Sequence, residues 1–265
     1  MSLGFCHTVR ERQRALRLRI QLDNPHGATL PLNYQHHLTA AIYGLLATSD
    51  TEYARFLHGT GYGPEGSSKR FKLFVFSWLR GRHRVEGDAL RFAPGPLVWQ
   101  IASPVPDFLN HCATGLLAKA VLNVGSAAFP ITQVQALPLP HFAETVHFTC
   151  LSPIVAALPL PGGGTRYLTP NDGEAFSAAV RANLLRKHET LYGGLPAEDR
   201  FQLTFDPTYL ERSHGGTKLM TYKDIQIRAA FAPFSASGSA ELLGVGYEAG
   251  FGEKNAAGFG MAEMK

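Results

Sequence analysis

The feature that most constrains this chain is a glycine-rich segment at residues 244–260, which reads GVGYEAGFGEKNAAGFG and holds six glycines. A glycine inside a helix costs about 1 kcal/mol relative to alanine, so we expect a loop here rather than a packed helix. Such a loop lets the backbone take positive φ or approach another group closely. Successive N–H groups without a Cβ between them can converge on an anion, and Lys254 adds positive charge. The segment therefore predicts an anion-binding loop, with phosphate as the expected anion.

The spacing of these glycines excludes two common phosphate-binding motifs. The segment is neither G-x-G-x-x-G after a strand nor G-x-x-x-x-G-K-[ST], so the dinucleotide-binding and Walker interpretations fail. Phe251 and Phe259 within it, and the apolar residues that follow, require packing against the rest of the protein. A flexible tail is therefore not expected.

The first strand is predicted from an alternating pattern between residues 16 and 22. Leucines and an isoleucine alternate there with Arg17, Arg19 and Gln21. Period-two alternation is typical of a half-buried strand, so we expect a strand with a basic outer face.

Two helices are predicted to follow this strand. Apolar residues from Tyr34 to Leu45 recur at helical spacing. Ser49 with Glu52 three residues later forms a capping-box pattern, which predicts the start of a second, short helix. His58 then lies in its last turn.

The remaining pattern repeats the same order of elements. Further strands are predicted at 71–79, 89–92, 97–102, 131–137, 145–152, 166–168, 201–205, 218–231 and 259–264. Helices are predicted at 107–121, at 169–191 behind a Thr-Pro-Asn-Asp start signal, and around Glu241. Two βαββαβ units predict an α+β fold of two tandem ferredoxin-like domains with a C-terminal glycine-rich loop, divided into residues 1–140 and 141–265. The cleft between two such sheets is a groove of RNA-binding type.

Composition adds weaker constraints. The 265-residue chain is 45% hydrophobic and carries a formal net charge of +4, which permits a polyanionic partner without indicating one. Its three cysteines are odd in number, widely spaced and without a CxxC pair, which favours a reducing compartment. The sequence has neither a secretory signal pattern nor an apolar run of eighteen residues. We expect a soluble, cytoplasmic protein that does not engage a membrane.

Several segments together resemble a known family. The run LLGVGYEAGFGEKNAAGFGM at 242–261 resembles the C-terminal signature of CRISPR-associated endoribonucleases that process precursor CRISPR RNA, members of the RAMP superfamily. NYQHHL at 33–38 looks like the first helix of that family, and FLH at 56–58 with KLFVFS at 72–77 looks like its catalytic segment. LSPI at 151–154 matches the opening of its second domain. The resemblance therefore touches nearly the whole chain.

This resemblance implies a reaction and a set of residues. The family cuts repeat RNA without a metal ion and leaves a 2′,3′-cyclic phosphate and a 5′-hydroxyl, so no cofactor is expected. The implied Tyr–His–Lys triad falls on Tyr43, His58 and Lys72 by position. In-line attack by a 2′-hydroxyl needs a base, an acid and positive charge at the phosphate. A histidine at a helix C-terminus titrates near neutral pH and suits either proton transfer. The sequence leaves open which of Tyr43 and His58 is the base.

Alternatives remain for two of these positions. Lys69 competes with Lys72, because the loop after His58 is long. His36 lies on the same helical face as Tyr43, and the pair His36–His37 competes with His58 for the catalytic role. A metal site at this pair is discounted, because no further ligands stand at a suitable spacing.

The expected partner is the repeat RNA of a precursor transcript. The residues expected to hold its backbone are Arg17, Arg19, Lys69, Arg70, Lys218, Lys223, Gly250, Gly252, Lys254, Gly258 and Gly260. Association with a CRISPR effector complex and homodimer formation are both left open. The rival functions are a non-catalytic RNA-binding RAMP subunit of an interference complex and, less supported, an unrelated ferredoxin-like phosphoryl-handling enzyme.

Overall fold

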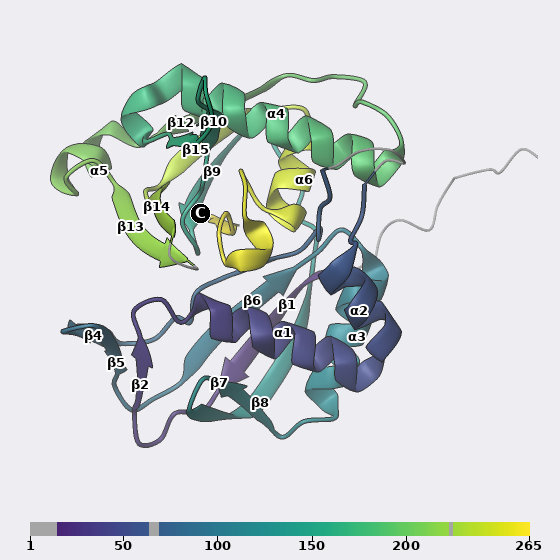
Figure 1. Ribbon diagram of the computed structural model, residues 1–265, viewed down its shortest axis with the longest axis vertical. Helices are drawn as coiled ribbons and strands as arrows, with labels where there is room; N and C mark the ends of the chain where they lie inside the picture. The colour runs from purple at the N-terminus through teal and green to yellow at the C-terminus, as the bar shows by residue number, and fades with distance from the viewer. Residues whose placement is uncertain (1–14, 64–68, 223–224) are drawn as a thin grey trace, which may run out of the picture.

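The computed structural model describes residues 15–63, 69–222 and 225–265, arranged as two lobes stacked one above the other (Figure 1). The N-terminal half forms the lower lobe and the C-terminal half forms most of the upper lobe. We divide the chain between the end of one long strand at Pro138 and the start of the next at Thr145. The expected boundary at residue 140 falls within this connection.

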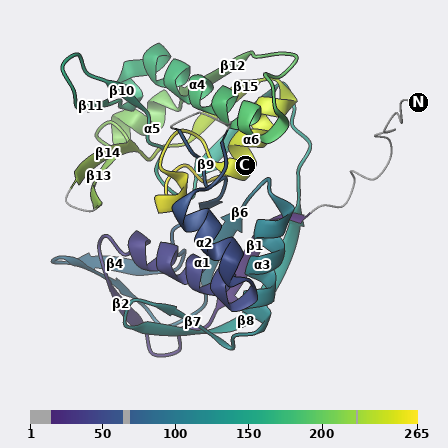
Figure 2. The same cartoon turned by 45° about the vertical axis from the view of Figure 1, so that its right-hand side comes forward.

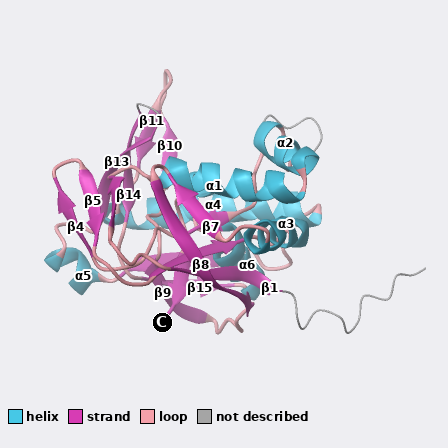
Figure 3. Ribbon diagram, turned by 90° about the horizontal axis from the view of Figure 1, so that it is seen from below, coloured by secondary structure: helices cyan, strands magenta, loops and turns pink. Residues whose placement is uncertain are grey.

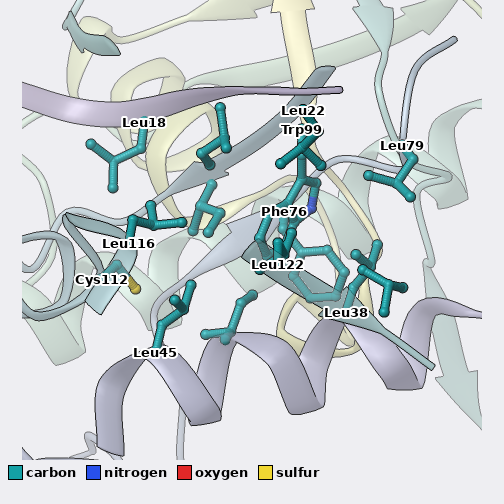
Figure 4. Packing of buried hydrophobic residues seen from close by; sticks show 14 of the residues in the cluster. Leu18, Leu22, Leu38, Leu45, Phe76, Leu79, Trp99, Cys112, Leu116 and Leu122 are labelled. Carbon is teal, nitrogen blue, oxygen red and sulfur yellow. The ribbon is translucent and has the colours of Figure 1, made fainter. Parts of the chain in front are cut away.

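The N-terminal lobe is built on a five-stranded antiparallel sheet in the order β3-β6-β1-β8-β7. These strands are β3 (Val75–Phe76), β6 (Leu97–Ala102), β1 (Ala15–Leu22), β8 (Ala127–Pro138) and β7 (Val121–Val124). The helices are α1 (Gln35–Ser49), α2 (Thr51–Gly59) and α3 (Pro106–Leu117). Apolar side chains of α1 and α3 meet those of the sheet in one buried cluster around Trp99 and Phe76 (Figure 4). This core holds α1 in a fixed position against the sheet.

The C-terminal lobe repeats the arrangement with a four-stranded sheet in the order β12-β15-β9-β16. Its strands are β12 (Phe201–Phe205), β15 (Phe234–Gly238), β9 (Thr145–Cys150) and β16 (Ala262–Met264). Its two long helices are α4 (Gly173–Tyr192) and α6 (Ala240–Ala249). If β7 is set aside and the four strands of each half are numbered along the chain, both sheets read second, third, first, fourth. This shared order confirms the predicted α+β fold of two tandem ferredoxin-like domains.

Each lobe also carries a hairpin between its second and third sheet strands. In the N-terminal lobe, β4 (His83–Glu86) and β5 (Ala89–Phe92) join β2 (Ala28–Pro31) in a small sheet. In the C-terminal lobe, β13 (Thr217–Tyr222) pairs with β14 (Ile225–Ala230). Both hairpins lie on the side of the molecule away from α2 (Figures 1 and 3). The smaller elements are β10 (Ala157–Pro159), β11 (Thr165–Tyr167), α5 (Pro207–Arg212) and the 3-10 turns η1 (Pro170–Asp172) and η2 (Asn255–Ala257).

The structure corrects several predicted elements. The single strand expected at 218–231 is the hairpin β13–β14, and the following strand β15, which completes the second sheet, was missed. The helix expected at 107–121 ends at Leu117. Asp50, rather than Ser49, caps α2: its carboxylate accepts a hydrogen bond from the Tyr53 N–H at 2.9 Å. The start signal at Thr169 is confirmed, because its side chain and the Asp172 carboxylate form a capping box.

The two lobes are joined by buried contacts from the last segment of the chain. Val75 and Ala102 of the N-terminal lobe cluster with Leu151 and Met261 of the C-terminal lobe. The segment that follows α6 lies between the lobes in both Figure 1 and Figure 2. No helix in the described part of the chain is both long and apolar enough to span a membrane.

Candidate active site between the two domains

A cleft of about 950 Å³ lies where the lobes face each other. Its N-terminal wall is formed by α1, the end of α2 and residues 69–74. Its C-terminal wall is formed by α4 and by residues 249–257 of the glycine-rich segment. The cleft therefore collects residues from five segments, three in the N-terminal half of the chain and two in the C-terminal half.

The structure brings the three predicted catalytic residues together in this cleft. Tyr43 on α1 is half-buried, and its ring meets the exposed His58 ring edge to face, with centroids 5.1 Å apart at 77°. Lys72 donates a hydrogen bond from Nζ to the His58 carbonyl oxygen at 2.8 Å. This carbonyl belongs to the last turn of α2, where carbonyls lack helical partners and favour a cation. Partial burial lowers the pKa of Lys72.

Two residues with positive φ lie next to Lys72: Gly61, which approaches it in space, and Leu73, which follows it in the chain. Gly61 has a φ of +68°, and a Cβ there would lie 2.6 Å from the Phe71 carbonyl oxygen and 3.3 Å from Lys72 Nζ. Leu73 has a φ of 53°, a conformation that costs a non-glycine residue about 1–3 kcal/mol. Its carbonyl oxygen is fixed by a 2.7 Å hydrogen bond from Ser103 Oγ. Glycine at position 61 therefore leaves room for the lysine, and surrounding contacts hold the strained turn beside it.

Two of the three alternates line the cleft, and the third lies elsewhere. His36 and Lys69 line the cleft. His36 Nδ1 lies 2.8 Å from the Asn33 carbonyl oxygen, so Nδ1 is the donor in this hydrogen bond. His37 lines a separate hollow against β7. Burial is the main cause that lowers the pKa of His37, and the charge of His36 is the second. The geometry thus supports His36 and Lys69 as alternates but not His37.

One predicted RNA-binding residue is wrongly placed by the sequence pattern. Arg17 is only 1% exposed, because the C-terminal lobe covers the face of β1 that was expected to be its basic outer face. Its Nη2 donates to the carbonyl oxygens of Tyr247 at 2.9 Å and Ala262 at 3.0 Å. Arg17 therefore joins the lobes and is not available to RNA.

The other predicted basic residues are distributed unevenly. Arg70 lines the cleft and donates to the Gly63 carbonyl oxygen at 2.7 Å. Arg19 is half-buried beside Arg17 on β1, and Lys218 is exposed on β13 outside the cleft lining. Lys223 lies outside the described residues.

The glycines of the C-terminal segment contact protein rather than open space. Gly250, Gly252, Gly258 and Gly260 are buried and have positive φ, and a Cβ on each would lie 2.2–2.9 Å from another protein atom. This corrects the expectation that they face an RNA backbone. Lys254 remains exposed at the cleft.

The expectation of a loop throughout the segment is wrong at its start. Gly244 and Gly246 lie within α6, and a Cβ on Gly246 would lie 2.3 Å from the ring of Phe251. The helix tolerates this glycine because it lets the following residues fold back onto the helix surface.

Sequence reasoning missed the contribution of α4 to the cleft. Asn183, Arg186 and Lys187 line its C-terminal wall. Lys187 follows Leu184 by three residues, on the same stripe as Phe176 and Val180, which are fully buried. A lysine in an apolar helical stripe is the signal that identifies this position in the sequence. Among the described residues, no cluster of three or more His, Cys, Asp or Glu side chains is arranged to hold a metal ion.

Comparison with known proteins gives consistent matches along the chain. The family model "CRISPR-associated protein Cas6, N-terminal" matches residues 29–135, and "CRISPR associated protein Cas6, C-terminal" matches residues 137–264. The chain is 28% identical over 253 residues to CRISPR-associated endoribonuclease Cas6 1 of Methanocaldococcus jannaschii, covering 94% of this chain and 92% of that relative. It is 27% identical over 246 residues to CRISPR-associated endoribonuclease Cas6 of Pyrococcus furiosus, covering 92% and 86%.

A solved structure of a RAMP protein described as binding different RNA substrates shares the fold. Its TM-score is 0.76 at 22% identity, over 94% of this chain and 99% of that protein. The tandem ferredoxin-like domains and the family-model matches define a CRISPR-associated protein. Within that class, the chain belongs to the Cas6 family.

Proposed function

We propose that this protein is an endoribonuclease that cuts CRISPR repeat RNA in precursor transcripts to release mature guide RNAs. The observation that carries the proposal is the convergence of Tyr43, His58 and Lys72 in one cleft. The two relatives named as endoribonucleases support the same activity.

The proposed reaction is a transesterification within the RNA that uses no metal ion. The 2′-oxygen of the nucleotide before the cut attacks the adjacent phosphorus, and the bond from phosphorus to the 5′-oxygen breaks. The 2′-hydroxyl proton passes to a base, and an acid gives a proton to the departing 5′-oxygen. The products are a 2′,3′-cyclic phosphate and a 5′-hydroxyl.

The ring pair of Tyr43 and His58 supplies the groups for these proton transfers. An imidazole can either accept or donate a proton, whereas an unperturbed phenol, with a pKa of about 10, is a weak base. Lys72 has three N–H donors, one of which binds the His58 carbonyl, so two remain for phosphate oxygens. A positioned ammonium stabilises the charge that grows on the phosphate in the transition state.

The cleft also provides contacts for the flanking RNA. Arg70 and Lys254 lie on opposite walls, one on each lobe, and bind backbone phosphates on either side of the cut. Lys69 adds a further positive charge on the N-terminal wall. These contacts set the register of the strand, and the bases are read along the groove.

The test is cleavage of repeat RNA in EDTA by the wild type and three variants. His58→Ala should lower the single-turnover rate by roughly 10²–10⁴-fold, the usual contribution of a positioned acid or base. Tyr43→Phe removes the phenol hydroxyl and keeps the ring, so it tests the hydroxyl separately from the ring packing. His37→Ala is the matched control, because its side chain faces away from the cleft and the rate should stay unchanged.

The chemistry of the ends tests the mechanism separately. A 2′-deoxy substitution at the nucleotide before the cut should abolish cleavage, and the 3′ fragment should accept phosphate at its free 5′-hydroxyl. Binding of repeat RNA without cleavage by the wild type would assign the chain instead to the RNA-binding RAMP subunits. Unchanged cleavage by His58→Ala would transfer the role to His36.

A further inference from the structure

Lys187 is a fully buried lysine that the proposed chemistry does not use. It lies on α4 with 1% of its surface exposed, at a position where a helical stripe would otherwise carry an apolar side chain. Burying an ammonium is strongly unfavourable unless it is paired or hydrogen-bonded. Its neighbours should therefore explain its presence.

The partners of Lys187 are backbone carbonyls at the start of the glycine-rich loop. Nζ donates to the carbonyl oxygens of Ala249 at 3.3 Å, Gly250 at 2.5 Å and Gly252 at 3.0 Å. An ammonium has three donors, and these three acceptors match them in number. Ala249 ends α6, where carbonyls lack helical partners and the helix dipole favours a cation. Lys187 therefore acts as a buried C-terminal cap for α6 and as an anchor for the residues after it.

The pKa of Lys187 indicates how strongly its charged form depends on the carbonyl oxygens that it contacts. The pKa of Lys187 is lowered to about 7, chiefly by burial; the charge of Glu253 opposes this shift, and the charge of Arg186 adds to it. With no carboxylate hydrogen-bonded to it among the described residues, the backbone carbonyls are its principal stabilisation.

The anchored loop continues directly into the C-terminal wall of the cleft. Lys254 follows Gly252 by two residues and is held at a φ of 59°. The Ala256 carbonyl oxygen then accepts a 3.1 Å hydrogen bond from Thr39 Oγ1 on α1. The loop is thus fixed at one end by Lys187 on α4 and at the other by α1, with Lys254 between these two points.

We propose that Lys187 is a positioning residue for RNA binding: by holding the carbonyls of residues 249–252, it presets Lys254 to contact a backbone phosphate on the C-terminal wall of the cleft. The RNA part of this proposal rests on the proposed function. The ordering of the loop does not.

Limited proteolysis tests the ordering of the loop without RNA. Lys187→Met removes the ammonium and keeps a long apolar side chain on the stripe. The trypsin site after Lys254 should then be cut at least tenfold faster than in the wild type, as followed by fragment mass. Lys119→Met, a change of the same kind on an exposed lysine near β7, is the control and should leave the cutting rate unchanged. Equal protection of wild type and Lys187→Met would overturn the proposal.

A double-mutant cycle tests the role in RNA binding. The measured quantity is the Kd for repeat RNA that carries a 2′-deoxy nucleotide at the cut, so that no cleavage occurs. Lys187→Met and Lys254→Gln should each weaken binding roughly tenfold to a hundredfold, the range for loss of one charged hydrogen bond. The double variant should bind no worse than Lys254→Gln alone, because one change acts through the other.

The same double-mutant cycle gives a different result if Lys187 and Lys254 act independently. Additive losses, or an unchanged Kd for Lys187→Met, would show that Lys187 does not act through Lys254 and would refute the proposal. The rate at saturating RNA should change less than threefold in Lys187→Met, because Tyr43 and His58 are untouched. If the methionine variant does not fold, Lys187→Gln carries the same cycle. A wild type that binds no repeat RNA would refute the proposed function and this role in RNA binding, while the proteolysis result would still decide the role in the loop.

Discussion

Removing the guanidinium of Arg17 should weaken the junction between the two lobes. Its Nη2 serves the carbonyl oxygens of Tyr247 and Ala262, and Nη1 lies 3.3 Å from Gln100 Oε1. Its Cζ also lies 3.8 Å from the centroid of the Tyr247 ring. Burial lowers the pKa of Arg17 to about 10, which leaves the group charged at neutral pH.

The magnitude follows from these contacts. In Arg17→Met, two carbonyls lose a buried donor at a cost of about 1–3 kcal/mol each. A desolvated cation–π contact adds about 2 kcal/mol. Release of a buried charge offsets part of this loss, so we expect a net destabilisation of about 3 kcal/mol. For a chain of this size, that corresponds to a fall in Tm of roughly 6–12 °C.

The assay is thermal unfolding followed by near-ultraviolet circular dichroism. Arg19→Met is the matched control, the same substitution two residues along the same strand. Within the described residues, the Arg19 side chain makes no hydrogen bond across the lobes, so its loss should cost less than about 1 kcal/mol. A loss below 1 kcal/mol in Arg17→Met, or equal losses in both variants, would refute the reasoning that Arg17 joins the lobes.

Three further predictions concern the loop, the pH response and the cleft. Gly260→Ala should lower the free energy of unfolding, measured by chemical denaturation, by more than 2 kcal/mol, because the added Cβ would lie 2.2 Å from a backbone carbonyl oxygen. Gly87 also has a positive φ but has open space around it, so Gly87→Ala is the control and should cost only about 1 kcal/mol. Burial raises the pKa of Glu248 from 4.5 to about 7, so the native state holds this proton more tightly than the unfolded state, and stability falls as pH rises from 4.5 to 7. The free energy of unfolding of Glu248→Gln should match that of the wild type near pH 4 and exceed it by ~3 kcal/mol at pH 8. An equal response of both proteins to pH would contradict this. Lys72→Met should slow RNA cleavage at least tenfold while Tm falls by only a few degrees, because the lysine is half-exposed and, among the residues that the structure describes, donates only to the His58 carbonyl. A loss of stability that matches the loss of activity would show that the role of Lys72 is structural.

The fold was predictable because local patterns and the order of elements agree. Alternation in β1, the helical stripe of α1 and the capping box at Thr169 each point to the element that forms. The strand β15 was missed because FSASG holds two serines, one alanine and one glycine beside its phenylalanine, which leaves little apolar contrast to read. The hairpin β13–β14 was missed because residues 218–231 contain no glycine or proline to mark a reversal of the chain.

The site was predictable only where family resemblance added to pattern. Tyr43, His58 and Lys72 were placed by resemblance, and the cleft that contains them forms from segments whose pairing no local pattern specifies. Arg17 was misplaced because alternation assigns a face of a strand but does not show that a second domain covers it. Lys187 was missed although its position in an apolar stripe is visible in the sequence.

The placement of β16 has a consequence for the order of events during synthesis. The strands of the N-terminal sheet are complete by residue 138, so that lobe can fold while the remainder is still being translated. The central strand β9 gains its partner β16 only when residues 262–264 have emerged, and Arg17 gains its carbonyl partners at about the same time. A nascent chain therefore carries His58 on a folded lobe before the opposite wall of the cleft exists. Both walls of the cleft are thus present only after one late step, rather than being added gradually as the chain grows.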